Sequence, residues 1–518
     1  MVSHVNTKNK LTGNKESSMT VETLYNSCLT KLTVKPHTGY QPDGIKWMIN
    51  KEINGNGGGI LADEVGLGKT LQAIGLVCAN RVNKTLILVP KSLVDQWCNE
   101  FQKFAPSVNV IKMESLKHDT MTFSGDTNVV IAPISQVYGR GEHKKNMINQ
   151  CDYKKTEFHR IEWGRLIIDE AHAIKNKKSK MHKACCDIDT EYKWLLTATP
   201  VMNKMKEFVN LMSFFGYGKN ECQTKKLEIV NEMILRRTKE DVKEFDEKLD
   251  LPELNVVIKE IPFETKEEEL LYKEVFFKMK KEMKNIPIGN QNMMKALERL
   301  LRIRQLCVHP QLYFDGLAKK NKVEPEQYTG NCTKVNALMK MLKEKPAEEK
   351  GLVFCQFIKE MQFYKEKIEE MGMKCMVIDG SMELEERTAV INKFKKESDL
   401  NILLIQINTG GTGYNLQEAN WVYIMSPTWN PCLEHQAIGR AHRTGQTKKV
   451  NVFKVIIKGE SDEYSYVEDN IIELQNKKKL IIADILNDKR IADECVKLVR
   501  VDKAATGITV RDINKLFK

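Results

Sequence analysis

The sequence has no long apolar run and no secretion signal. No stretch of its 518 residues approaches the ~20 consecutive apolar residues that a membrane-spanning helix needs. The polar N-terminus, MVSHVNTKNKLTGNKESS, lacks the apolar segment of a signal peptide. Long low-complexity tracts are also absent, and hydrophobic residues make up 42% of the chain, enough for real cores. We therefore predict a folded protein that is neither secreted nor bound to a membrane.

The sequence also has no pair of cysteines in a C-x-x-C arrangement. Its 13 cysteines are scattered, and only Cys185 and Cys186 are close neighbours. An odd number without zinc-ligand spacing is typical of reduced thiols in an intracellular protein and not of a disulfide framework. Cys307 and His309 have no second pair of ligands nearby. We expect a reducing compartment and no structural zinc.

Positive charge exceeds negative charge by a moderate amount. Lys and Arg number 81 and Asp and Glu number 69, which gives a formal net charge of +12. This balance favours a polyanionic partner such as nucleic acid. A lysine-rich solvated surface explains the same charge equally well, so the partner must be argued from motifs.

Short apolar runs separated by amphipathic segments occur in two parts of the chain. The first set is TLILVP (85–90), NVVIAP (128–133), RLIIDE (165–170) and WLLTATP (194–200). The second set is GLVFCQF (351–357), CMVID (375–379), ILLIQI (402–407), WVYIMSP (421–427) and VNVFKVI (450–456). Buried strands that alternate with helices are typical of parallel sheets. The predicted fold class is therefore α/β, with two parallel-sheet domains.

The texture of the sequence changes between and around these two parts. Residues 1–35 are polar and predict an N-terminal arm, and 36–235 form the first lobe. Residues 236–332 carry long charged helical segments without a strand-like run, and predict a linker and a helical protrusion. The second lobe follows at 333–475 and a helical tail at 476–518.

A glycine-rich turn leads into a helix within GGGILADEVGLGKT, residues 57–70. Backbone N–H groups at such a helix N-terminus bind phosphate, with Lys69 reaching the β- and γ-phosphates and Thr70 binding Mg²⁺. The strict pattern G-x-x-x-x-G-K-[ST] is not met, because Asp63 occupies the first glycine position. Turns that end in GKT also arise by chance, so this ATP site needs further support.

An acidic pair supplies that support. Asp169 and Glu170 follow the apolar run LII, at the carboxyl end of a strand, where open α/β sheets bind their ligands. The aspartate can hold Mg²⁺, and the glutamate can orient and deprotonate the attacking water. Without a phosphate loop, an acidic helix cap would explain the pair better. Thr197 and Thr199 end the next run, and their hydroxyls are expected to face the same crevice.

Several segments of the first part resemble the Swi/Snf family of DNA-dependent translocases, in the second helicase superfamily. DEVGLGKT, IIDEAHAIKN (167–176) and LLTATPVMN (195–203) are similar to its first three ATPase motifs. YQPDGIKWMINKE (40–52) resembles its adenine-side motif, and LILVPKSLVDQW (86–97) its first DNA-contacting motif. The phrase WMINKE followed by GGGILADE is most similar to the Rad-type branch, which is active in DNA repair.

The second part carries the matching motifs. QAIGRAHRTGQ (436–446) places Arg440 and Arg443 on one helical face, where salt bridges to surface carboxylates would normally explain them. This segment is very similar to the last Swi/Snf motif, which implies that both are arginine fingers. Further resemblances are NTGGTGYNLQEANWVYIMSPTWNP (408–431), FCQF, DGSMELEER (379–387), MILRRTKEDV followed by LPEL, and LRIRQLCVHPQL (301–312).

The resemblance implies two RecA-like lobes joined by family-type helical segments, and it implies a set of site residues. The ATP-binding residues would be Gln41, Asp63, Glu64, Val65, Gly66, Leu67, Gly68, Lys69, Thr70 and Gln436, with Thr70 and Asp169 as Mg²⁺ ligands. The catalytic residues would be Lys69, Glu170, Arg440 and Arg443. The DNA contacts would be Lys91, Thr199, Gln406, Gly411 and Trp429.

The sequence departs from the family pattern in a few places. Val65 replaces the usual methionine, and Gln406 and Ile407 stand where the family usually has Ser or Thr, which removes one expected phosphate contact. No Cys/His cluster interrupts the lobes. The RING insertion of many Rad-type relatives is therefore missing, and ubiquitin-ligase activity is not expected.

The sequence thus predicts an ATP- and Mg²⁺-dependent motor that translocates on double-stranded DNA without sequence preference and remodels or displaces DNA-bound proteins. Transcription, chromatin or repair proteins are the expected partners, in the nucleus, another DNA-containing compartment or a viral replication site. A strand-separating DNA or RNA helicase is an alternative, because the DEAH box occurs in both groups. A non-catalytic DNA-binding scaffold is the alternative of another class, and the intact set Lys69, Asp169, Glu170, Arg440 and Arg443 argues against it.

Overall fold

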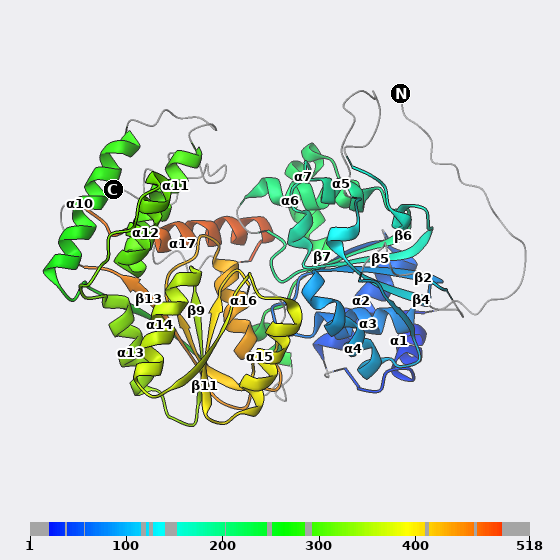
Figure 1. Cartoon of the computed structure of the whole chain (residues 1–518). Coiled ribbons are helices and arrows are strands. Elements are labelled where there is room, and N and C mark those ends of the chain that lie inside the picture. The colour runs from blue at the N-terminus through cyan, green and yellow to red at the C-terminus, as the bar shows by residue number, and fades with distance from the viewer. Residues whose placement is uncertain are drawn as a thin grey trace, which may run out of the picture.

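The chain folds into two parallel-sheet lobes that lie side by side (Figure 1). The computed structural model describes residues 20–36, 39–55, 57–114, 121–123, 128–139, 153–201, 204–245, 251–284, 293–409, 414–459 and 464–488. Within these residues, no helix is long and apolar enough to cross a membrane. The predicted α/β fold class is confirmed.

The first lobe is built on a seven-stranded sheet with the order β3-β4-β2-β5-β6-β1-β7. Its strands are β1 (Gly58–Leu61), β2 (Lys84–Val89), β3 (Asn109–Lys112), β4 (Asn128–Pro133), β5 (Trp163–Asp169), β6 (Thr190–Leu196) and β7 (Ile234–Leu235). Its helices are α1 (Val21–Leu29), α2 (Tyr40–Asn54), α3 (Lys69–Ala79), α4 (Val94–Phe104), α5 (Lys180–Cys186), α6 (Met205–Met212), α7 (Lys219–Thr224), α8 (Lys226–Met233) and α9 (Lys239–Phe245). All of its strand pairs are parallel.

The second lobe has a six-stranded sheet with the order β10-β11-β9-β12-β13-β8, again with parallel pairs. Its strands are β8 (Leu254–Ile261), β9 (Lys350–Cys355), β10 (Lys374–Ile378), β11 (Leu400–Gln406), β12 (Ala419–Ile424) and β13 (Val450–Ile457). Its helices are α10 (Lys266–Lys284), α11 (Met293–Val308), α12 (Pro310–Asn321), α13 (Thr333–Glu344), α14 (Ile358–Glu370), α15 (Leu384–Lys396), α16 (Pro431–Ala441) and α17 (Val467–Leu486).

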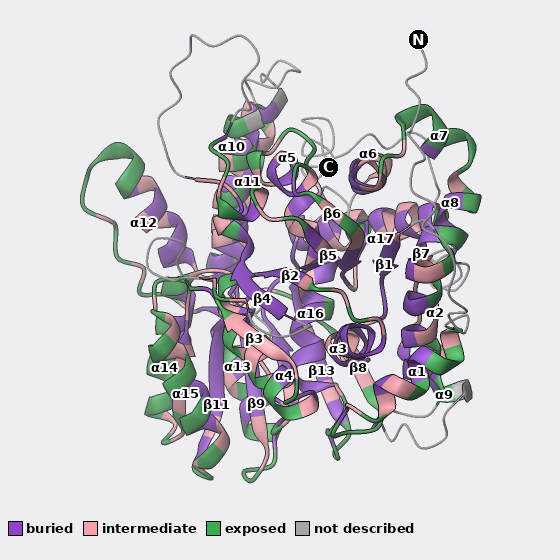
Figure 2. Ribbon diagram, turned by 90° about the vertical axis from the view of Figure 1, so that its right-hand side faces the viewer, coloured by how far each residue is buried: buried purple, intermediate pink, exposed green. Residues whose placement is uncertain are grey.

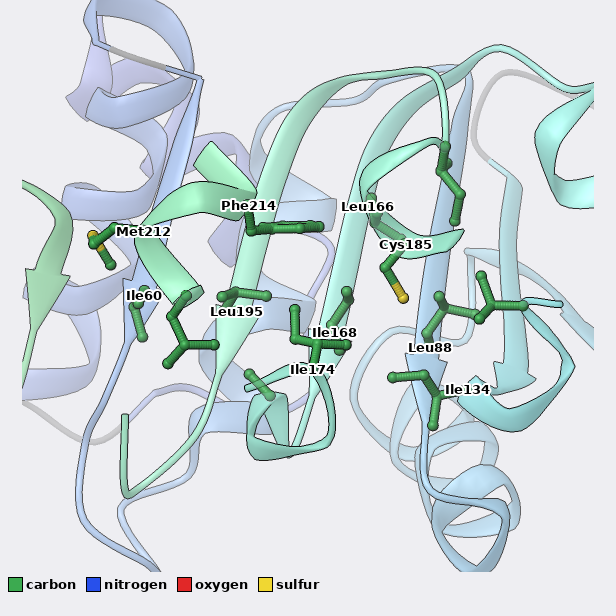
Figure 3. Close-up of a cluster of buried hydrophobic side chains, with 14 of the residues drawn as sticks. Ile60, Leu88, Ile134, Leu166, Ile168, Ile174, Cys185, Leu195, Met212 and Phe214 are labelled. Carbon is green, nitrogen blue, oxygen red and sulfur yellow. The ribbon is translucent and has the colours of Figure 1, made fainter. Parts of the chain in front are cut away.

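The apolar runs are continuous because helices cover both faces of each sheet. In the first lobe, Leu166 and Ile168 of β5 pack into one core cluster, and Ile167 between them packs into the other. Figure 3 shows the first cluster, with Leu166, Ile168 and Leu195 on neighbouring strands. Successive side chains of a strand point to opposite faces, so each run fills two cores at once. Figure 2 shows the strands largely buried and the exposed residues gathered on outer helix faces such as those of α14 and α15.

Two segments differ from the sequence-based boundaries. The expectation that 236–332 contains no strand was wrong, because residues 254–261 form β8, the edge strand paired with β13. Its sequence, LNVVIKEI, combines a short apolar run with charged residues, and Leu254, Val256 and Ile258 are exposed, so it lacks the solid run expected of a buried strand. Helix α1 lies within the range given to the polar arm, and it packs into the first lobe because its apolar residues recur at helical spacing.

Helix α17 joins the two lobes, as Figure 1 shows. Its start, with Val467 and Ile471, belongs to the core around α10 and α11, whereas Ile482 and Ile485 belong to the core of the first lobe. An ion pair of 3.0 Å between Lys226 and Asp484 reinforces the second contact. The helix crosses the boundary set at residue 476, and it holds the lobes against each other.

Candidate active site

The predicted phosphate loop lies between β1 and α3. Gly68 precedes the helix in the left-handed conformation with φ 74°, and a Cβ there would lie 2.5 Å from Gln41 Nε2. Glycine is therefore required at this turn. Lys69 Nζ donates to the Asp63 carbonyl at 2.7 Å and to the Glu64 carbonyl at 3.3 Å. The loop thus presents a lysine and a helix N-terminus together, which is the arrangement that binds phosphate.

Lys69 lies among carboxylates from both sides of the site. Burial lowers its pKa, and the negative charges of Glu170, Asp63, Asp169 and Glu64 oppose that shift. A half-buried ammonium at a helix N-terminus with carboxylates beside it suits a polyphosphate that carries a divalent cation, since such a ligand brings both signs of charge.

The acidic pair follows β5, as predicted. Asp169 Oδ1 accepts a hydrogen bond of 2.8 Å from the Glu170 backbone N–H, and Oδ2 accepts one of 2.9 Å from Trp97 Nε1. Burial and the neighbouring charge of Glu170 raise the pKa of Asp169 to about 6. Burial also acts to raise the pKa of Glu170, but His172, Lys69 and Arg440 outweigh it and lower that pKa. Glu170 is therefore ionised at neutral pH, as a proton-accepting group must be.

The two arginines of α16 and the following loop reach this site from the second lobe. Arg440 is 5% exposed, and burial lowers its pKa to about 10 against the opposing charges of Glu170 and Asp169. Arg443 is half-buried at the interface, where desolvation lowers its pKa and the negative charge of Glu100 opposes that shift. Both predicted arginines therefore face carboxylates of the first lobe.

The phosphate loop touches the second lobe directly. A Cβ at Gly439 would lie 2.6 Å from Val65 Cγ1, so only glycine permits this approach of α16. The Thr444 hydroxyl donates to the Gly66 carbonyl at 3.0 Å. These contacts make the predicted site a composite of both lobes.

Other predicted ATP-binding residues lie around the loop in different roles. The carboxylate of Asp63 is fully buried and engaged within the lobe, by Arg237 Nη2 at 2.6 Å and Gln72 Nε2 at 2.9 Å. Leu67 is buried with Tyr40 and Val242, and its carbonyl accepts a hydrogen bond of 3.3 Å from Gln41 Nε2. Asp63 and Leu67 therefore support the loop with their side chains and do not present those side chains to a ligand.

Gln41 contacts the loop from the first lobe, and Gln436 lies on α16 of the second lobe. Gln41 is 3% exposed on α2, and Gln436 is 4% exposed on α16. Thr70, the second residue of α3, follows Lys69 at the start of the helix. All three stay predictions as nucleotide or metal contacts.

The predicted DNA contacts are spread over both lobes. Lys91 is exposed at the turn after β2, and Thr199 follows β6, where its hydroxyl faces the Cys432 thiol of the second lobe. Gln406 ends β11, and its Oε1 accepts a hydrogen bond of 2.9 Å from the Gly380 backbone N–H. Gly411 lies outside the described residues.

Trp429 is placed differently from the other predicted DNA contacts. Its ring packs beside the cations of Arg304, at 6.0 Å, and Lys478, at 5.8 Å, and it borders the core around α11 and α17. The Trp429 ring therefore packs against other parts of the protein, and its role as a DNA contact stays a prediction.

Three further residues of the site were not found from the sequence: Trp97, Arg237 and Lys239. Lys239 connects the lobes, because its backbone N–H donates to Glu64 Oε2 at 2.9 Å and its Nζ donates to the His442 carbonyl at 2.6 Å. The segment MILRRTKEDV was noted as family-like, and this was the available signal for Arg237 and Lys239.

The residues of this site fit a divalent cation only if a phosphate-bearing ligand supplies further oxygen donors. Asp169 offers carboxylate oxygens and Thr70 a hydroxyl, which are the hard donors that Mg²⁺ prefers. Among the described residues, no group of three or more His, Cys, Asp or Glu side chains could hold a metal by itself. Mg²⁺ binds through one or two carboxylates plus substrate phosphates, which is the donor set present here.

Two family models match the chain: the SNF2-related domain at residues 40–221 and the helicase conserved C-terminal domain at residues 333–445, together more than half of its length. The chain belongs to the SNF2-related family. The family prediction is thereby confirmed, together with the class of ATP-dependent, helicase-like motors. The closer likeness to the Rad-type branch stays a prediction.

Relatives of this SNF2-related chain come from viruses, animals and bacteria. The probable global transactivator of Orgyia pseudotsugata multicapsid polyhedrosis virus is 27% identical, over 88% of this chain and 93% of the viral protein. The mouse SWI/SNF-related matrix-associated actin-dependent regulator of chromatin subfamily A member 1 is 30% identical, over 89% of this chain and 44% of its own length. An uncharacterized ATP-dependent helicase of Mycoplasma genitalium is 30% identical, over 86% of this chain and 42% of its own length. The chain thus spans less than half of the cellular relatives.

A solved structure also aligns with the SNF2-related chain. The Sulfolobus solfataricus SWI2/SNF2 ATPase core in complex with dsDNA covers 91% of this chain and 98% of its own, with 24% identity and a TM-score of 0.39.

Proposed function

We propose that this protein hydrolyses ATP with Mg²⁺ and uses the energy to translocate on double-stranded DNA, remodelling or displacing DNA-bound proteins. The observation that carries the proposal is that α16 of the second lobe packs on the phosphate loop, where Gly439 meets Val65 and Thr444 bonds to Gly66, and brings the charge of Arg440 next to Glu170 and Lys69. Hydrolysis at a site shared by two lobes changes how the lobes are held together, and this is how ATP turnover becomes movement.

The roles within the site follow from its charges. Glu170, the ionised carboxylate, orients the attacking water and accepts its proton. Lys69, Arg440 and Arg443 stabilise the negative charge that develops on the transferred phosphoryl group. Asp169 and Thr70 would hold Mg²⁺, which would supply positive charge to neutralise the phosphates.

Double-stranded DNA as the track is supported by the family, by the predicted contacts and by the names of the relatives. Lys91 follows β2 of the first lobe, and Gln406 ends β11 of the second lobe. A movement of one lobe relative to the other would therefore act on a duplex that is bound to both. The formal net charge of +12 favours a polyanion. Phosphate contacts carry no sequence information, so binding should be non-specific.

The relatives support a role close to chromatin or transcription. One is named a regulator of chromatin and another a global transactivator of a virus. Remodelling or displacing proteins on DNA, in a nucleus or at a viral replication site, fits both names. The partner proteins would be those of transcription, chromatin or repair.

A strand-separating helicase is the second candidate, because one relative is named an ATP-dependent helicase. Strand displacement and triplex displacement by the same preparation distinguish the two activities. A duplex translocase displaces a triplex-forming strand and leaves the duplex paired, whereas a helicase releases a duplex strand.

The test of the main proposal is the ATPase rate with duplex DNA, single-stranded DNA and RNA in parallel. Duplex DNA should stimulate hydrolysis most, with little sequence dependence, and stimulation should fall steeply between about 50 and 200 mM salt, because counterion release dominates such contacts. Stimulation by RNA without stimulation by DNA would refute the duplex-tracking function. Activity that no nucleic acid changes would refute a nucleic-acid motor altogether.

A further inference from the structure

Trp97 connects the predicted DNA-contacting segment of the first lobe to the predicted metal ligand. The residue is 1% exposed on α4, and its Nε1–H donates to Asp169 Oδ2 at 2.9 Å. Since the other oxygen of Asp169 accepts from the Glu170 backbone N–H, both carboxylate oxygens are oriented. Only the bond from Trp97 comes from a different part of the chain, 72 residues away.

The position of α4 connects this hydrogen bond to the predicted DNA-contacting turn. The helix starts directly after the turn Lys91–Leu93, which follows β2 and carries the exposed Lys91. A helix is rigid over this short length, so a displacement at its start reaches Trp97. Glu100, three residues beyond Trp97, faces Arg443 of the second lobe. One helix therefore follows the predicted DNA-contacting turn, bonds to the predicted metal ligand and places the charge of Glu100 near a predicted arginine finger.

We propose that Trp97 is a positioning residue that orients Asp169 for Mg²⁺ and transmits DNA binding at Lys91 to the nucleotide site. This inference rests on the proposed function for the identity of the track. The geometry requires no movement of β5, because an indole N–H bond that strengthens or weakens with the tilt of α4 changes the orientation of the Asp169 carboxylate directly.

The experiment removes the N–H and keeps the aromatic packing. Trp97→Phe does this, and Trp163→Phe is the matched control, because Trp163 is also 1% exposed and its Nε1 donates to a backbone carbonyl, that of Phe158, at 2.9 Å. The primary readout is the binding of a fluorescent ADP analogue as Mg²⁺ is titrated, without DNA and then with saturating duplex DNA.

In Trp97→Phe, the Mg²⁺ concentration that gives half of the maximal gain in affinity for the ADP analogue should rise about 10-fold or more. An increase of this size is typical when a group that orients a metal ligand is removed. Binding of the analogue in EDTA should not change. Duplex DNA should lower the Mg²⁺ requirement of the wild type and of Trp163→Phe, but not that of Trp97→Phe. Equal Mg²⁺ curves for the two variants would overturn the positioning role.

The outcomes also separate this inference from the proposed function. If duplex DNA stimulates the wild-type ATPase and both variants respond to it equally, the coupling through Trp97 is refuted while the motor stands. If duplex DNA has no effect on the wild type, the motor and the coupling both fall, and the Mg²⁺ curves without DNA still decide whether Trp97 orients Asp169.

A second measurement covers the case in which Trp97→Phe does not fold. In wild-type protein labelled with ¹⁵N at tryptophan, the Trp97 indole resonance can be assigned by elimination with Phe replacements at the other tryptophans. That resonance should shift when Mg²⁺ is added to the ADP complex and again when duplex DNA is added. A resonance that neither addition moves would overturn the proposal.

Discussion

The Thr444 hydroxyl of the second lobe donates a hydrogen bond of 3.0 Å to the Gly66 carbonyl of the phosphate loop, across 378 residues of sequence. Gly439 lies against Val65 at the same interface, where a Cβ would come within 2.6 Å. The arginines between and beside these contacts are therefore held at the phosphate loop by backbone packing and not by long flexible loops. We therefore expect a nucleotide at this loop to contact both lobes.

The first prediction concerns the arginines. Arg443→Ala and Arg440→Ala should each reduce kcat in saturating DNA by orders of magnitude, because an arginine finger contributes about 10³–10⁵ in rate. Nucleotide affinity should change much less, since the stabilised charge develops in the transition state. Stopped-flow nucleotide binding and steady-state hydrolysis on the same preparations measure both quantities.

Arg160→Ala provides the control for these variants. Arg160 forms an exposed pair with Glu157 at 2.5 Å, and its side chain is 76% exposed. Such pairs contribute about 0–1 kcal/mol to stability. Near-normal kcat in both Arg440→Ala and Arg443→Ala would mean that the second lobe does not complete the site.

The second prediction distinguishes Glu170 from Lys69. Glu170→Gln keeps the shape of the side chain and removes the proton acceptor, so it should bind ATP and hydrolyse it very slowly. Lys69→Ala should abolish hydrolysis and weaken nucleotide binding as well, because it removes the ammonium that meets the phosphates. Filter binding of radiolabelled ATP, followed by analysis of the retained nucleotide, separates the two. Rapid turnover by Glu170→Gln would exclude it as the proton acceptor.

The third prediction is about stability and follows from the pair of Asp63 and Arg237. The carboxylate is fully buried and the arginine side chain is 14% exposed, with Nη2 and Oδ2 at 2.6 Å. Removing one partner of a buried pair leaves an uncompensated charge, so Arg237→Ala should lower the free energy of unfolding by about 3–5 kcal/mol. Urea unfolding of this variant beside Arg160→Ala tests the value. A loss as small as that of Arg160→Ala would show that the pair is not structural.

The sequence was informative where the determinants are local. The apolar runs predicted buried strands because each strand fills two cores, and the phosphate loop was recognisable because its turn and helix start are contiguous. Edge strand β8 was missed because its sequence, LNVVIKEI, lacks a solid apolar run, so only its pairing with β13, about two hundred positions away, marks it as a strand, as in the contact of Asn255 with Asn451. The bond from Trp97 to Asp169 is likewise non-local. Neither contact leaves a periodic trace in the sequence.

The partner of Asp63 is a second example of a distant contact that the sequence did not indicate. The substitution of aspartate for glycine at the start of the loop was visible, but its consequence was not. Arg237, 174 residues away, neutralises the carboxylate that would otherwise repel phosphate. The first position of the loop, Asp63, thus supports the loop through its bond to Arg237 and does not present its side chain to a ligand.

The last prediction concerns Glu360 of α14, a carboxyl group that is 1% exposed in the second lobe. Its Oε2 accepts backbone hydrogen bonds from Gln356 at 2.8 Å and Phe357 at 3.0 Å, and burial raises its pKa from 4.5 to about 7. The unfolded chain releases this proton near pH 4.5, whereas the folded chain retains it up to about pH 7. The contribution of Glu360 to the free energy of unfolding is therefore fully present below pH 4.5 and is lost as pH rises through this window.

Glu360→Gln keeps an acceptor for the two backbone N–H groups and removes the titration. Between pH 5 and pH 8, the stability of the wild type relative to this variant should fall by about 1–3 kcal/mol, given 1.36 kcal/mol per pKa unit. Glu366→Gln, at an exposed position of the same helix, is the control for replacing a glutamate of α14 by glutamine. Urea unfolding at four pH values measures all three proteins, and a pH-independent difference between wild type and Glu360→Gln would show that burial does not hold the proton on Glu360.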